Sequence, residues 1–240
     1  MVVSLYLLLS LVFLWLFFRL WQLRQTSQTR AAGTLILQMV LFGLVYDSWV
    51  LVAGSIVGEG DMLMRLNLGR YVFFAVFTPL LMITGADFAA RLGVVWAEKW
   101  YFQVVIWVAA ICLVGLGSVL EWQFKDALVV ERMWGTLRYV HPMEFLPFAP
   151  VLTNVVLIFL GGLAWWKGRW PWMLVGAVVM LVGGVIPTAW GGALISLGAQ
   201  GILVGCLVAT EQRLLTPDFS LTESELNSRI SSVAGRSKKK

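Results

Sequence analysis

Residues 32–57 read AGTLILQMVLFGLVYDSWVLVAGSIV, an apolar run whose only charged side chain is that of Asp47. A run of about 20 apolar residues is long enough to cross the hydrocarbon core of a bilayer as an α-helix. The run therefore predicts a transmembrane helix. It also raises a question, because a carboxylate is costly to bury among apolar side chains without a partner.

The composition extends this prediction to the whole chain. Of the 240 residues, 60% are hydrophobic and only 13% are charged, whereas soluble domains contain about 25% charged residues. Because backbone hydrogen bonds must close within each span in lipid, long apolar runs are expected to be helices. We predict an all-α, seven-transmembrane-helix bundle over residues 1–213, with a short basic tail over 214–240 and spans at 2–23, 32–57, 68–93, 100–121, 144–166, 170–189 and 192–212.

The distribution of Lys and Arg predicts the orientation of the bundle. These residues gather in the first, third and fifth connections and in the tail, and they are fewer in the other connections. Basic connections face the cytoplasm in multi-pass proteins. We therefore expect an outside N-terminus and a cytoplasmic C-terminus, in a bacterial inner membrane or an equivalent membrane. The RSKKK ending of the tail either contacts anionic lipid or only enforces this orientation.

Small residues predict which spans pack together. The seventh run contains Gly201 and Gly205, four residues apart, and the sixth contains Gly176 and Gly183. Small side chains let helix backbones approach closely in lipid. We expect the sixth and seventh spans to pack against each other within one chain, with Pro187 ending or kinking the sixth helix.

Asp47 and Asp87 lie well inside predicted spans, and each has a predicted partner. Asp87 is four residues before Arg91, which allows an ion pair on one helix face. Asp47 has no such local partner, but the short connection between the second and third spans makes these helices antiparallel neighbours. Arg70 then lies within reach of Asp47. From the sequence, Asp47 is either charged and paired with Arg70 or neutral and available as an acid.

Other polar and aromatic residues are expected near the same outer mouth of spans two to five. Candidate catalytic residues are Asp47 as an acid, together with His141 and Glu144 at the start of the fifth span. A polar cluster at one mouth of an apolar bundle is typical of a small-molecule site, although a structural network that ties loops to helix ends is the alternative. The candidate substrate-binding residues are Arg70, Asn67, Tyr46, Trp49 and Tyr71.

Several functional classes are excluded by what the sequence lacks. None of the lysines lies inside a predicted span, so a retinal Schiff base is excluded. Gly69-Arg70-Tyr71 stands at the outer end of the third span, where the acidic-Arg-Tyr triplet of a G-protein-coupled receptor does not occur. A single His makes metal and haem sites improbable, so we expect no cofactor and no metal. The basic charge is explained by topology, so no nucleic-acid partner is expected.

Residues 46–81, YDSWVLVAGSIVGEGDMLMRLNLGRYVFFAVFTPLL, resemble an uncharacterised group of multi-span proteins from bacteria and plastids. The pattern of that group is Tyr-Asp, Gly, Gly-Glu-Gly, Leu-Asn, Arg and Thr-Pro-Leu-Leu. It has a His four residues after the Arg, where this chain has Phe74. The resemblance implies no known activity, but it implies that Asp47, Asn67 and Arg70 belong together.

Three functions are compatible with these features. The first is a membrane protein that binds an apolar small molecule, such as a lipid, isoprenoid or pigment, or a membrane-protein partner. The second is an intramembrane enzyme, of cyclase or isomerase type, in which Asp47 protonates an isoprenoid and aromatic rings stabilise the cation. The third is a proton-coupled transporter with Asp47 and Asp87 as relays. The absence of a recognised catalytic motif favours the first.

Overall fold

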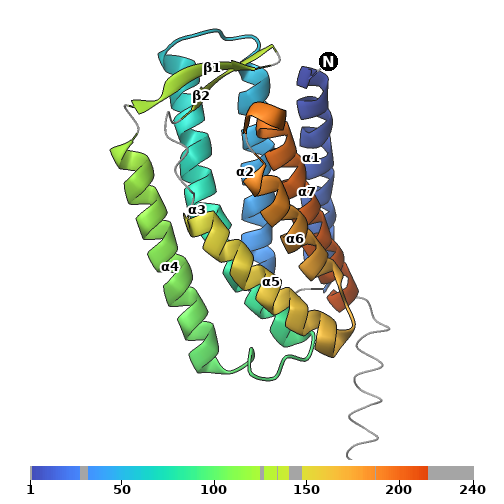
Figure 1. Ribbon diagram of the computed structural model, residues 1–240. Coiled ribbons are helices and arrows are strands. Elements are labelled where there is room, and N and C mark those ends of the chain that lie inside the picture. The colour runs from blue at the N-terminus through green and yellow to red at the C-terminus, as the bar shows by residue number, and fades with distance from the viewer. Residues whose placement is uncertain are drawn as a thin grey trace, which may run out of the picture.

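The computed structural model describes residues 2–27, 32–124, 127–133, 135–140, 148–186 and 188–215 as seven helices and one β-hairpin (Figure 1). The helices are α1 (Val2–Ser27), α2 (Ala32–Ala53), α3 (Asp61–Arg91), α4 (Trp100–Gln123), α5 (Phe148–Gly168), α6 (Trp172–Val185) and α7 (Thr188–Leu215). The strands are β1 (Val129–Met133) and β2 (Thr136–Val140). The tail predicted over 214–240 lies almost wholly outside the described residues.

Six of these helices are long and apolar enough to cross a membrane, which confirms the all-α, multi-pass prediction. The sixth predicted span, 170–189, is the exception, because α6 has only 14 residues. At 1.5 Å per residue it is about 21 Å long, shorter than a bilayer core of about 30 Å. The helix ends because Ile186 has extended backbone angles, φ −66° and ψ 124°, which is the conformation that a following proline favours.

Neighbouring helices pack mostly in chain order, with α7 returning to α1 and α2. The close packing predicted for the last two spans is present. A Cβ added at Gly176 would lie 2.9 Å from Cys206, and one at Gly183 would lie 2.4 Å from Ala199. Gly201 instead faces Phe13 of α1. Helix α4 packs chiefly along α3 and stands at the edge of the bundle (Figure 1).

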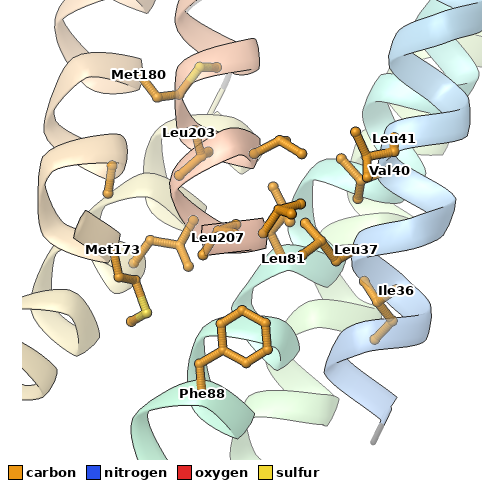
Figure 2. Close-up of a cluster of buried hydrophobic side chains, with 14 of the residues drawn as sticks. Ile36, Leu37, Val40, Leu41, Leu81, Phe88, Met173, Met180, Leu203 and Leu207 are labelled. Atoms are coloured by element: carbon orange, nitrogen blue, oxygen red, sulfur yellow. The ribbon is translucent and has the colours of Figure 1, made fainter. Parts of the chain in front are cut away.

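The core lies where α2, α3, α6 and α7 converge. Figure 2 shows Leu37 and Leu41 of α2, Leu81 of α3 and Leu203 and Leu207 of α7 in the region between α2 and α6. All five belong to one cluster of buried apolar side chains. This cluster fixes the spacing of the helices that carry the polar residues.

The fourth connection contains a hairpin that the sequence did not predict. Strands β1 and β2 pair antiparallel, with Val129 opposite Val140. The hairpin lies across one end of α2 and α3, called here the hairpin end (Figure 1). Leu137 N donates to Gly54 O at 3.1 Å, and Leu137 and Tyr139 bury Leu63. A glycine is required at position 54, because a Cβ there would lie 2.0 Å from Leu137 O.

Replacing Gly54 with Ala is expected to displace the hairpin from the ends of α2 and α3. The added methyl group cannot fit against the Leu137 carbonyl, so residues 129–140 should exchange their amide hydrogens at least tenfold faster. Gly115→Ala is the matched control, because a Cβ at Gly115 meets nothing within 4 Å. Unchanged exchange in Gly54→Ala would show that the hairpin is not held by this contact.

Candidate functional site

An ion pair between Asp47 and Arg70 joins α2 to α3 at the hairpin end. Arg70 Nε donates to Asp47 Oδ1. The Arg70 and Asp47 side chains are 12% and 21% exposed, respectively. The predicted partner of Asp47 is therefore confirmed, and of the two alternatives that the sequence left open, the structure has the paired one.

Two further candidate residues complete this network. Arg70 Nη1 donates to Asn67 Oδ1 at 2.9 Å, and Asn67 Nδ2 donates to Leu63 O at 2.9 Å. Asn67 is buried. The Tyr46 hydroxyl donates to Leu66 O at 3.0 Å, also across the contact between α2 and α3. Asp47, Arg70 and Asn67 thus lie together, as the sequence predicted.

The remaining candidates lie outside this network. The Tyr71 hydroxyl donates to Tyr139 O at 2.8 Å, so this residue anchors the hairpin. Trp49 is 55% exposed and lies on the surface of the bundle, where an aromatic side chain contacts lipid. His141 and Glu144 lie outside the described residues. The structure therefore brings together part of the predicted cluster and assigns Tyr71 a contact with the hairpin.

A pocket lies about one helical turn from the ion pair, on the side away from the hairpin. It has a volume of about 30 Å³, which is room for one or two water molecules or a group of similar size. Leu44 and Phe74 line it, three residues from Asp47 and four residues from Arg70 along their helices. Its lining comes from five helices: Val40, Leu44, Phe74, Thr78, Leu81, Thr153, Asn154, Leu157, Met180, Gln200, Leu203 and Val204.

The lining of this pocket combines apolar and neutral polar side chains. Eight of the lining residues are apolar, and Thr78, Thr153, Asn154 and Gln200 are polar without charge. Sequence reasoning named none of these four as a site residue, although Thr78 begins the Thr-Pro-Leu-Leu pattern. A Thr, Asn or Gln within an apolar run carries no charge to mark it, and only the packing of α3, α5 and α7 brings these residues together.

A second polar network lies at the opposite end of the bundle, called here the tail end, where α1, α3, α5 and α7 finish. Glu211 of α7 is fully buried there. Its Oε2 accepts from Arg91 Nη1 at 2.7 Å, and its Oε1 accepts from the Thr34 hydroxyl at 2.8 Å. Arg91 Nη1 also lies 3.4 Å from Asp87 Oδ2, which confirms the predicted pair within α3. The sequence prediction missed Glu211, although it falls inside the predicted seventh span.

Neither polar network resembles a metal site, and comparison of the chain with known protein families and curated proteins assigns it no function. The described residues contain no group of three or more His, Cys, Asp or Glu that could hold a metal ion. No protein-family model matches this chain, and no curated protein is similar to it.

Breaking the Asp47–Arg70 pair should destabilise the bundle. Asp47→Asn leaves the largely buried charge of Arg70 without its partner, and Arg70→Gln does the same to Asp47. Each change should lower the free energy of unfolding by about 2–3 kcal/mol. The charge swap Asp47→Arg with Arg70→Asp should recover about half of this loss. Denaturation of the purified protein in detergent measures these values.

The exposed pair between Glu59 and Arg132 provides the control. These side chains are 51% and 75% exposed, so Glu59→Gln should cost less than about 1 kcal/mol. If both single changes at Asp47 and Arg70 destabilise the protein and the swap recovers nothing, the two side chains do not stabilise it as a pair.

Proposed function

We propose that this chain is an integral membrane protein that binds an apolar small molecule, such as a lipid, isoprenoid or pigment, within its helical bundle. The observation that carries this proposal is the pocket among α2, α3, α5, α6 and α7. Its lining, largely apolar with a few neutral polar groups between helices, has the composition of a small-molecule site, and its volume of about 30 Å³ accommodates one end of such a molecule. The Asp47–Arg70–Asn67 network lies about one helical turn from this pocket and joins α2 to α3, two of the helices that line it.

The ion pair favours binding over acid catalysis. A carboxyl that protonates an isoprenoid must carry a proton and face its substrate. The Asp47 carboxyl is instead engaged by Arg70, and Asp47 is not among the residues that line the pocket, so it does not face a substrate bound there. Asp87 is likewise beside Arg91, and nothing in the geometry links it to Asp47 as a relay for protons.

We further propose that α6 crosses the membrane despite its length, which gives seven crossings with the N-terminus outside and the C-terminus in the cytoplasm. Helix α6 packs between α5 and α7. Basic residues in the last turns of four helices support the orientation, because Arg24, Arg91, Lys167 and Arg213 all lie at the tail end.

Reporters fused to the two termini test this topology. Seven crossings place the termini on opposite sides, so a reporter that is active only in the cytoplasm should work at the C-terminus and fail at the N-terminus. Activity at both termini would mean an even number of crossings and would exclude α6 as a full span.

A pocket-filling substitution tests the binding function. Val204 lines the pocket and is buried, and Ile202 on the same helix is 49% exposed. Val204→Phe should reduce the amount of apolar compound that co-purifies with the protein about tenfold, since the added ring fills the space. Ile202→Phe adds a ring to the same helix on its exposed side and should change nothing. Mass spectrometry of organic extracts measures the bound compounds.

Overpacking at Val204 is expected to cost about 1–3 kcal/mol, so the thermal unfolding of both variants is measured alongside. If the unchanged protein carries no apolar compound, or if Val204→Phe folds and retains the same amount, the binding proposal is wrong. Loss of an associated membrane protein with unchanged small-molecule content would favour the partner-binding alternative instead.

A further inference from the structure

Asn154 of α5 lines the pocket and carries a hydrogen-bond acceptor that has no partner in the described part of the chain. Its side chain lines the pocket, and the residue is only 5% exposed. Asn154 Oδ1 has no hydrogen-bond partner among the described residues. Buried polar atoms in proteins are nearly always hydrogen-bonded, and one left without a partner is costly. A donor that is not part of the described chain would remove this cost.

Two of the other polar residues of the pocket have hydrogen bonds within their own helices. The Thr153 hydroxyl donates to Ala149 O at 2.8 Å, within its own helix. Gln200 Nε2 lies 3.2 Å from the Ser196 hydroxyl oxygen, within α7. None of the three other polar lining residues, Thr78, Thr153 and Gln200, donates to Asn154 Oδ1, so we leave this acceptor to an occupant of the pocket.

The lining restricts the chemistry of that occupant. None of the residues that line the pocket is charged, so an ammonium or a carboxylate would enter without a counter-charge and at high cost. A volume of about 30 Å³ admits a compact polar group together with the carbon atom that carries it. The eight apolar lining residues suit the carbon atoms that adjoin it.

We propose that Asn154 Oδ1 accepts a hydrogen bond from the hydroxyl group of a neutral, long-chain alcohol, such as a lipid or isoprenoid alcohol. This inference rests on the proposed binding function and specifies its ligand class. The hydroxyl lies in the pocket and donates to Asn154, and the first carbons of the chain contact Leu157 of α5 and Leu203 and Val204 of α7. Selectivity comes from one hydrogen bond and does not involve charge.

Two matched probes test this assignment in the full-length protein reconstituted in lipid nanodiscs. One is a long-chain alcohol with a diazirine close to the hydroxyl, and the other is its methyl ether, which lacks the donor. Photolysis followed by peptide mass spectrometry measures labelling of the pocket residues on α5 and α7. The alcohol should label them at least about tenfold more than the ether, since a site built around an acceptor discriminates against a ligand without the donor.

Asn154→Leu removes the acceptor at similar size and should lower labelling by the alcohol to the level of the ether. Gln123→Leu is the control, because it makes the same change from amide to alkyl group at an exposed position of α4, a helix that does not line the pocket. The ratio of alcohol to ether labelling in the unchanged protein decides the question if Asn154→Leu does not fold.

The possible outcomes separate this inference from the proposed function. Equal labelling of the pocket by both probes in the unchanged protein would overturn the role of Asn154 and leave the binding function standing. Labelling of the pocket by neither probe would overturn both, and the pocket would then hold water alone.

Discussion

A charge inside a bundle of apolar helices has to be neutralised by another part of the protein, and this constraint governs how α2 and α3 meet. At the hairpin end, Asp47 of α2 pairs with Arg70 of α3. At the tail end, Thr34 of α2 and Arg91 of α3 both bond to Glu211 of α7. A shift of one helix along the other would break both sets of contacts and leave charges buried alone. The two networks therefore fix the register of α2 against α3.

The same two networks close the ends of the bundle and leave the neutral pocket between them. The hairpin covers the end next to Asp47, with Leu137 bonded to Gly54 and Tyr71 bonded to Tyr139. The apolar cluster of Figure 2 fills the space toward the tail end. The pocket consequently lies at the depth of the apolar core, at the point where five helices come together.

The helices and the Asp47–Arg70 pair could be predicted because both follow from local properties of the sequence. An apolar run of sufficient length specifies a span, and a short connection specifies antiparallel neighbours, which places Arg70 near Asp47. The predicted end of the sixth span, residue 189, lies beyond the observed end of α6 at Val185. The sequence could not show this, because apolar residues continue past Ile186 although the helix does not.

The hairpin and Glu211 could not be predicted because their stability depends on residues far away in the sequence. Two five-residue strands are marginal by themselves, as short isolated hairpins are in water. Contacts with Gly54 and Leu63 hold them in place. Glu211 lies near the end of an apolar run, where a carboxylate is usually solvated. Its burial depends on the position of α7 against α2 and α3, which spacing along the chain does not give.

Pairing of the buried charges also determines what kind of recognition this interior can offer. Arg138 and Glu211 are the buried charged residues in the described part of the chain, and each has a partner of opposite charge. Attraction of an ionic ligand would require one of these pairs to open, at the cost of an isolated charge. The hydroxyl proposed above imposes no such cost, because Asn154 Oδ1 has no hydrogen-bond partner among the described residues. The arrangement that holds the helices in register is therefore compatible with the proposed recognition of a neutral hydroxyl at Asn154.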